Sequence, residues 1–167
     1  MIVNYEATNS AQINISGLAE AATNVKLLKN DVSVGEVTTS DSGDFVFTDV
    51  ALDEGENKFF AIASKDKVGS SDISKMIKVN YDKVAANLVM INPSEDSIKV
   101  DTADFDVIGQ SEKGINVTVN NRLAMVDDTG KFKIKFQLNA GKNDIEIIVK
   151  DLAGNETRKK ITITFEF

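Results

Sequence analysis

The sequence contains nearly the same pattern twice, and this repetition limits the possible folds more than any other feature. Three short segments return in the same order, with glycine, aspartate or asparagine at matching places; they are residues 43–47, 52–57 and 66–69, which return as 130–134, 138–143 and 151–155. Each copy has the order turn, strand, turn, strand, turn, strand. Repetition at this period predicts an array of similar modules rather than one large fold.

The repeat divides the chain of 167 residues into two domains, which we place at residues 1–83 and 84–167. Each half has the length of a small domain. A domain of this size buries roughly 60 to 65% of the surface of its unfolded chain, so each half should fold alone with limited stability. We therefore expect two small hydrophobic cores.

Apolar and polar residues alternate along much of the chain, whereas helical spacing is almost absent. Phe132, Ile134 and Phe136 face one way and the lysines between them face the other, as in a strand with one buried face. The pattern predicts strands near 11–16, 24–29, 32–38, 44–51, 57–63 and 73–81, an extra strand near 2–6, and then 87–91, 97–101, 104–109, 115–120, 123–127, 131–138, 143–150 and 157–166. About seven short strands per copy predict an all-β fold of two antiparallel β-sandwiches.

A Leu-x-x-Gly-x-Asn element occurs once in each copy, from Leu52 to Asn57 and from Leu138 to Asn143. We expect the leucine to end a strand inside the core and the glycine to adopt a positive φ. The asparagine should hydrogen-bond the backbone of the turn, and the later Asp66 and Asp151 should close hairpin turns in the same way. These elements therefore indicate architecture rather than chemistry.

Pro93 is the one proline of the chain and follows an apolar run. It lacks a backbone donor, so it suits an edge strand or a break at which the first strand changes sheets.

The second copy resembles the bacterial immunoglobulin-like modules related to the domain found in glucodextranase. The resemblance covers nearly all of residues 88–167 and is carried by Val107, Gly109, Gly114, Val117, Val119, Asn120, Val126, Asp127, Gly130, Phe132, Leu138, Gly141, Asn143, Ile145, Ile147, Val149, Asp151, Ala153, Gly154, Asn155 and Thr157. The first copy matches less fully, at Gly17, Val25, Gly43, Phe45, Gly55, Asn57, Asp66 and Gly69, with Ser70 in place of the final asparagine. Extra residues at 30–37 predict a longer central hairpin in that copy.

This resemblance implies two tandem immunoglobulin-like sandwiches of an extracellular or cell-surface bacterial protein. Such modules serve as spacers, stalks or accessory domains and generally lack catalytic residues. The resemblance specifies the fold well and the ligand hardly at all.

Composition excludes several classes of function. The chain has no histidine and no cysteine, so Ser-His and Cys-His nucleophilic sites and thiolate or imidazole metal sites are excluded. The formal net charge of −7 opposes binding to nucleic acid. No apolar run has the length that crosses a bilayer, so we expect no membrane insertion. The N-terminal residues lack the pattern of a secretion signal, and we expect a fragment of a longer exported protein. We assign no catalytic, cofactor-binding or metal-binding residue.

Carboxylates are the remaining candidates for chemistry. The densest group is Asp41, Asp44, Asp49, Asp53, Glu54 and Glu56, with no lysine or arginine among them. Such a stretch can ligate calcium, but its spacing follows no metal-loop signature, and we favour a solvated strand end. The same two interpretations apply to residues 127–130 and 151–155.

A glycan site usually displays exposed aromatic rings. Tryptophan is absent, and tyrosine occurs at Tyr5 and Tyr81 alone. The adjacent Phe59 and Phe60 must face opposite ways, and we expect the outer ring to be covered. We expect Phe165, which shares a face of the last strand with the terminal phenylalanine, to pack inside.

Two functions remain open. The leading interpretation is a non-catalytic spacer or stalk module, with other domains of a longer chain or surface proteins as partners. The alternative is a carbohydrate-binding or accessory pair of a polysaccharide-active enzyme. A Lys-to-Asn or Lys-to-Asp isopeptide bond would suit a stalk and would lower the intact mass. Any binding function should lie where the copies differ, at residues 30–37 and 41–56.

Overall fold

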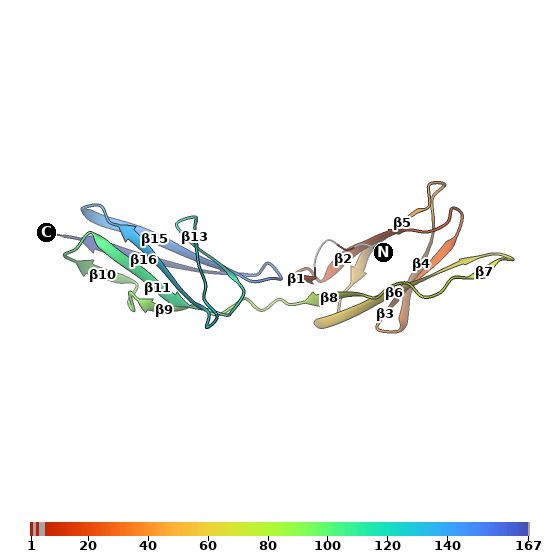
Figure 1. Cartoon of the computed structure of the whole chain (residues 1–167), viewed down its shortest axis with the longest axis horizontal. Helices are drawn as coiled ribbons and strands as arrows, with labels where there is room; N and C mark the ends of the chain where they lie inside the picture. The colour runs from red at the N-terminus through yellow and green to blue at the C-terminus, as the bar shows by residue number, and fades with distance from the viewer. Residues whose placement is uncertain (2, 4–5, 167) are drawn as a thin grey trace. The chain divides into compact units, whose positions relative to one another are not determined.

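The structure is a computed structural model that describes residues 1, 3 and 6–166. The chain forms two compact units, Met1–Lys83 and Val84–Phe167, which we call unit 1 and unit 2 (Figure 1). The described residues form strands and turns, with no helix among them. The all-β prediction is confirmed.

Unit 1 contains two sheets. Its strands are β1 (Ala7–Thr8), β2 (Gln12–Leu18), β3 (Asn24–Lys29), β4 (Val32–Thr38), β5 (Asp44–Ala51), β6 (Gly55–Lys65), β7 (Gly69–Ser70) and β8 (Ile77–Tyr81). The larger sheet has the order β1-β8-β6-β3-β4, with β7 also paired to β6, and the smaller sheet is β2-β5.

Unit 2 repeats this arrangement with one more strand in its smaller sheet. Its strands are β9 (Val89–Asn92), β10 (Ser97–Val100), β11 (Asp104–Gln110), β12 (Asn116–Val119), β13 (Arg122–Ala124), β14 (Lys131–Gln137), β15 (Gly141–Lys150) and β16 (Glu156–Phe165). The sheets have the orders β10-β16-β15-β12-β13 and β14-β11-β9. In both units a short strand runs parallel to the last strand, β1 to β8 and β10 to β16.

Most predicted strands lie within a few residues of the observed ones. The predicted strand 73–81 is wrong in its first part, because β8 begins at Ile77. The hydroxyls of Ser71 and Ser74 accept hydrogen bonds from the amides of Ala63 and Ala61, at 3.1 and 2.9 Å, in place of a continuous backbone ladder. The extra strand expected near residues 2–6 falls largely outside the described residues.

Pro93 lies at a change of sheet, which is one of the two places that the sequence indicates for it. It follows β9, which pairs with β11 in the smaller sheet, and precedes β10, which pairs with β16 in the larger sheet. The Asn92–Pro93 peptide bond is cis. The first strand of unit 2 is therefore divided between the two sheets.

Each unit buries its own apolar residues between its sheets. The centre of unit 1 includes Ile15, Leu27 and Phe59, which are fully buried, and unit 2 buries Val107 and Ile147 to the same degree. In each unit a glycine lies tightly against an aromatic ring, where β2 pairs with β5 and where β11 pairs with β14. A methyl group on Gly17 would lie 2.5 Å from the ring of Phe45, and one on Gly109 would lie 2.4 Å from the ring of Phe132. These glycines let the rings cross the neighbouring strand.

The central hairpin is longer in unit 1, as the extra residues at 30–37 predict. It consists of β3 and β4, with six and seven residues, whereas β12 and β13 have four and three.

Candidate functional site

The repeated asparagine of each Leu-x-x-Gly-x-Asn element organises a turn. The side-chain oxygen of Asn57 accepts a hydrogen bond from the Asp53 amide at 2.9 Å, and its amide group donates to the carbonyls of Asp53 and Gly55 at 2.7 and 3.0 Å. Gly55 has a φ of 91°.

Asn143 repeats these contacts in unit 2. It accepts from Asn139 at 2.9 Å and donates to the carbonyls of Asn139 and Gly141 at 2.8 and 3.0 Å. The predicted role of both asparagines in the turn backbone is confirmed.

The two units share a second turn, which lies outside the repeated sequence segments. Asn30-Asp31 connects the two strands of the central hairpin in unit 1, and Asn120-Asn121 does so in unit 2. All four residues have positive φ, between 46° and 68°. The side-chain oxygens of Asn30 and Asn120 accept hydrogen bonds from the amides of Lys58 and Glu146, at 2.9 and 2.8 Å. Paired asparagine and aspartate between two strands is the sequence signal for such a turn. It fixes the hairpin to the neighbouring long strand in both units.

Aspartates close two turns of unit 2. Asp127 Oδ1 accepts hydrogen bonds from the Thr129 hydroxyl at 2.6 Å and from the amides of Thr129 and Lys131 at 2.8 and 3.0 Å. The Thr129 hydroxyl, followed by these amides, holds the pKa of the Asp127 carboxyl below its ordinary value. Asp151 Oδ1 likewise accepts from the Asn155 amide at 2.9 Å. These carboxylates accept hydrogen bonds from backbone amides and thereby stabilise the turns.

The expectation for Asp66 is wrong. Among the described residues its carboxylate accepts no hydrogen bond, and the Val68 amide donates instead to the Lys65 carbonyl at 3.1 Å. The β6–β7 turn is therefore closed by the main chain alone, because Lys67 with a φ of 63° and Gly69 with a φ of 116° supply the reversal.

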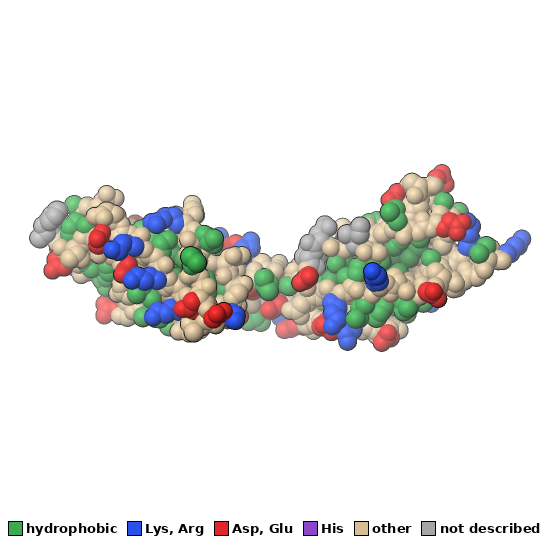
Figure 2. Space-filling model, in the orientation of Figure 1, with side chains coloured by type: hydrophobic (Ala, Val, Ile, Leu, Met, Phe, Trp, Pro, Cys, Tyr) green, Lys and Arg blue, Asp and Glu red, His purple; other side chains and the backbone are tan. Residues whose placement is uncertain are grey.

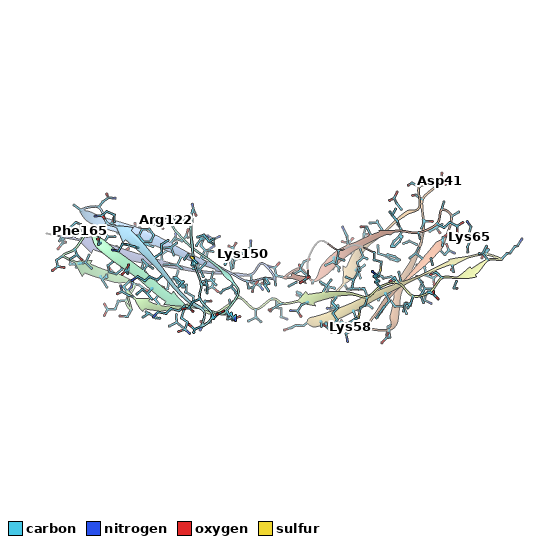
Figure 3. The ribbon with its side chains drawn as sticks, in the orientation of Figure 1. Asp41, Lys58, Lys65, Arg122, Lys150 and Phe165 are labelled. Atoms are coloured by element: carbon cyan, nitrogen blue, oxygen red, sulfur yellow. The ribbon has the colours of Figure 1, made fainter. Side chains whose placement is uncertain are left out.

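The fold places the acidic side chains of residues 41–56 apart from one another, and several of them pair with lysines. Asp41 lies at the tip of the β4–β5 turn, away from Lys58 (Figure 3). Lysines reach Asp53, Glu54 and Glu56; the pairs are Lys29 with Asp53 at 3.0 Å, Lys83 with Glu54 at 2.7 Å, and Lys78 and Lys58 with Glu56 at 2.9 and 3.5 Å.

Lys29, Lys78 and Lys83 are distant in sequence from the acids with which they pair, which is why the run of residues 41–56 looks more acidic than it is. The hydrogen bond from Lys78 is the main cause that lowers the pKa of Glu56. Figure 2 shows acidic and basic side chains interspersed on the face that it presents. Within the described part of the chain, no three acidic side chains are grouped so as to hold a metal ion.

The aromatic residues are largely inside. Phe59 is fully buried and Phe60 is half-buried on the opposite face, while Phe165 is buried in unit 2. Phe136 is half-buried, and the Arg122 guanidinium lies 5.0 Å from its ring centre.

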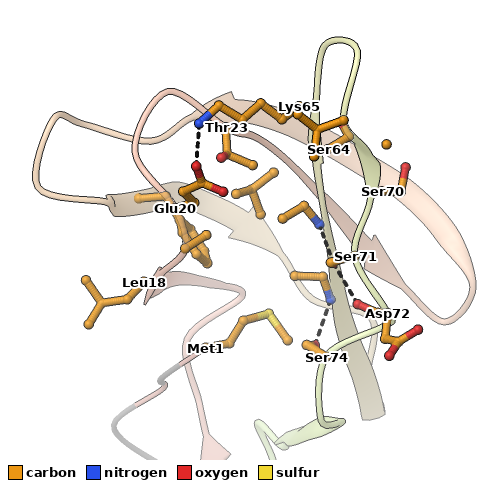
Figure 4. Close-up of a pocket in the computed structure, with 17 residues that line it drawn as sticks. Met1, Leu18, Glu20, Thr23, Ser64, Lys65, Ser70, Ser71, Asp72 and Ser74 are labelled. Carbon is orange, nitrogen blue, oxygen red and sulfur yellow. Dashed lines mark hydrogen bonds and ion pairs between the residues drawn. The ribbon is translucent and has the colours of Figure 1, made fainter.

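Unit 1 contains a pocket that sequence reasoning missed. It has a volume of about 530 Å³ and lies at the end of the sandwich where β6 turns into β7 (Figure 4). Val25, Phe45, Ala61 and Ala63 contribute apolar lining. The signal in the sequence is the pair of small residues Ala61 and Ala63, because the register with the neighbouring central strand gives these positions to Ile147 and Val149 in unit 2.

Polar groups surround this apolar lining. The ammonium of Lys65 pairs with the Glu20 carboxylate at 2.5 Å beside the pocket, and the hydroxyls of Ser71 and Ser74 are used by β6 (Figure 4). Thr23 also lines the pocket and is 4% exposed. Its Oγ1 is buried and has no hydrogen-bond partner. Such a group is costly unless a ligand satisfies it.

Comparisons with known proteins identify the module type. Residues 86–167 match the family model described as Glucodextranase, domain B. The match confirms for the second module the resemblance drawn from its turns.

A relative and a solved structure extend the comparison to both units. Bacillopeptidase F of Bacillus subtilis (strain 168) is 33% identical over 162 residues, which are 96% of this chain and 11% of that protein. The fibronectin(III)-like modules of Clostridium thermocellum CbhA superpose with a TM-score of 0.63 at 15% identity, and the match covers 98% of this chain and 90% of theirs. The chain is thus a pair of immunoglobulin-like β-sandwiches, a type of module found within longer bacterial proteins.

A search of the described residues for a helix of sufficient length and hydropathy to cross a membrane finds none.

Proposed function

We propose that residues 1–83 and 84–167 are two non-catalytic domains that serve as a spacer or stalk within a longer extracellular bacterial protein. The observation that carries the proposal is the use of the repeated polar side chains. Asn57, Asn143, Asn30, Asn120 and Asp127 all bind main-chain groups of their own unit. The feature that the two units share is therefore a set of side-chain hydrogen bonds that stabilises the turns between strands.

The match to Bacillopeptidase F supports the placement in a longer chain, because the 162 matched residues correspond to 11% of its length. Other domains of such a chain would be the first partners. A domain pair that separates other domains of the chain needs two units that fold and bear force independently of each other, and it needs no reactive group. Location outside the cell follows from the same proposal.

Single-molecule force spectroscopy of the whole chain tests whether the units act as separate mechanical domains. A spacer of two domains should unfold in two events, each of which lengthens the chain by somewhat less than about 27–30 nm, because about 83 residues extend by roughly 3.3–3.6 Å each and the folded unit already spans part of that length. A single event with the combined length would contradict two independent domains.

Affinity electrophoresis with soluble polysaccharides tests the alternative of an accessory glycan-binding pair. We expect unchanged mobility of the whole chain with β-glucans, α-glucans and xylan. Retardation by one of these polymers would replace the spacer proposal with the accessory function.

A further inference from the structure

The larger sheet of unit 1 carries apolar side chains on its outer side. Side chains alternate along β6, so that Phe59 and Ala61 are buried in the core while Phe60 and Ile62 lie on the opposite side of the sheet, where both are half-buried. Leu28 of the neighbouring strand β3 pairs with Phe60 and is half-buried on the same side.

Met76 extends this apolar side toward β8. The register of β6 and β8 pairs Phe59 with Ile77, so Met76, one residue earlier, lies beside Phe60 on the outer side of the sheet. Its side chain is 46% exposed. We call this set of residues the Phe60 face; it consists of Leu28, Phe60, Ile62 and Met76. Contiguous apolar side chains at a protein surface mark a site of interaction.

Unit 2 has charged residues at the matching positions. Counted from the asparagine that both turns share and from its partner in the last strand, Phe60 corresponds to Glu146 and Met76 to Lys160. The Glu146 carboxylate lies 3.9 Å from the Lys160 ammonium and 3.8 Å from the Arg158 guanidinium. The sandwich therefore does not require apolar residues on this side, and their presence in unit 1 calls for another explanation.

Charged side chains of both signs border the Phe60 face. Lys26 lies 3.6 Å from Glu36 at one end, and Lys58 and Lys78 lie 3.5 and 2.9 Å from Glu56 at the other. An apolar centre within a polar rim is the usual composition of an interface between proteins.

We propose that two copies of this chain associate through their Phe60 faces, about a two-fold axis that runs along the strands between β3 and β6. This axis places Leu28 of one copy opposite Phe60 of the other. Because β4 and β8 exchange sides, Lys78 of one copy lies opposite Asp31 in the β3–β4 turn of the other, and no lysine lies opposite a lysine. The face is thus complementary to itself, as a two-fold interface must be.

The size of the face fits a weak dimer. The strands β8, β6, β3 and β4 lie side by side, and with about 4.8 Å between strands and about 3.3 Å per residue over residues 56–64 they cover about 500 Å². Two facing copies therefore bury about 1,000 Å² in total, which is near the lower limit of specific interfaces. We expect a dissociation constant of roughly 0.1–1 mM.

The surroundings of the ring favour a protein surface over a sugar. Leu28 and Met76 flank Phe60 on its two sides, so aliphatic groups rather than hydrogen-bonding groups lie next to the ring. A sugar hydroxyl placed on this row would lose its hydrogen bonds to water without replacement.

Sedimentation equilibrium of the whole chain, from about 10 μM to about 1 mM, tests the proposal over a range that reaches the expected dissociation constant. We expect the average mass to rise with concentration from the 18.1 kDa of one chain toward twice that value. Isotope-labelled chain should show concentration-dependent NMR shifts at the amides of Leu28, Phe60 and Met76.

Two variants link the association to the Phe60 face. Met76→Glu and Phe60→Glu each place a carboxylate in the apolar centre and should weaken the dimer by roughly tenfold or more. Because Met76 is the more exposed of the two, Met76→Glu should leave the midpoint of urea unfolding unchanged, and this variant tests the face even if Phe60→Glu destabilises unit 1. Leu123→Glu places the same carboxylate at a 70% exposed position of unit 2 and should associate as the parent chain does.

The proposal is overturned if the chain remains a monomer up to about 1 mM, or if the Met76→Glu variant associates as tightly as the parent chain. Concentration-dependent shifts confined to unit 2 would assign the association to another surface and would also contradict it. A monomer whose Phe60 amide shifts on addition of soluble β-glucan would assign the face to a sugar instead. The association goes beyond the spacer function and does not depend on it, because force spectroscopy measures one chain at a time.

Discussion

Units 1 and 2 share their turns and differ in how one side of the sandwich is closed. In unit 2, ten residues of β15 pair continuously with β16, from Gly141 to Lys150. In unit 1, five residues of β6 pair with β8, from Gly55 to Phe59, and the regular pairing then stops until Ser64 and Lys65, which pair with β7. The two units therefore have the same turns, whereas the pairing of their long strands β6 and β15 differs.

The cores differ in the same region. Ala61 and Ala63 of unit 1 stand at the register positions of Ile147 and Val149, so unit 1 buries less aliphatic volume there. A reduced core and a shorter ladder should make unit 1 the less stable module. The pocket that results is where a distinct function can arise.

The largest expected effect tests the shared turns. Gly43 and Gly130 have φ of 85° and 83°, and a methyl group on them would lie 2.3 Å from the Ala19 carbonyl oxygen and 2.1 Å from that of Ser111. Gly43→Ala and Gly130→Ala should each destabilise their own unit by about 3 to 4 kcal/mol in urea unfolding. A small loss in one unit and a large loss in the other would show that the turns are not equivalent.

The next prediction separates the two asparagines by burial. Asn57 is fully buried, whereas Asn143 is partly exposed. Asn57→Ala should therefore cost about 3 kcal/mol and Asn143→Ala about 2 kcal/mol, because water can reach the groups that Asn143 leaves unpaired. Urea unfolding with probes in each unit measures both. Equal losses would mean that burial does not distinguish these turns.

A smaller effect concerns the irregular segment of unit 1. Ser71→Ala and Ser74→Ala each remove an acceptor of a β6 amide and should each destabilise unit 1 by about 1 kcal/mol. Ser70→Ala, at an exposed neighbouring position, is the control. If all three serine variants unfold alike, the hydroxyls do not stabilise the segment.

The smallest expected effect is a dependence on pH. The pKa of Asp127 in the folded chain lies below the ordinary value of 3.8, so its stabilising contribution is present above pH 3.8 and is lost as the pH falls through the lower, folded pKa. Unit 1 has Ser40 in the corresponding turn, where its hydroxyl accepts from the Asp44 amide at 3.1 Å.

Asp127→Asn should therefore flatten the acid dependence of the unfolding midpoint of unit 2, while Ser40→Ala should leave that of unit 1 unchanged. Thermal melts over a range of acidic pH values provide the measurement. An unchanged acid dependence in the Asp127→Asn variant would exclude this carboxyl as a cause.

Most of the fold could be predicted from the sequence because the determining features are local. Alternation marks the strands, as in residues 131–137, and the glycine and asparagine of each repeated element mark its turn. The position of Pro93 also indicated the division of the first strand. These features require contacts with near neighbours or with one adjacent strand.

The candidate site could not be predicted because its parts meet only in the folded unit. Thr23, Phe45 and Ala61 come from different segments, and no motif joins them. The acidic stretch was misleading for the same reason, since Lys29 and Lys78 reach it from other strands. The shared turn at Asn30 and Asn120 was locally visible but lies outside the repeated segments by which the copies were aligned.

Native-state hydrogen exchange of the whole chain tests the central claim most directly. That claim is that the two units share the same turns and that the regular strand pairing of β6 in unit 1 is interrupted at Ala61 and Ala63. The amides of Ala61 and Ala63 bind serine hydroxyls, whereas Ile147 and Val149 lie in the continuous β15–β16 pairing. We predict that the two alanine amides exchange through a local opening, with a lower free energy than global unfolding of unit 1, while the amides of Ile147 and Val149 exchange through global unfolding of unit 2. Alanine amides that exchange by global unfolding of unit 1 would contradict the claim.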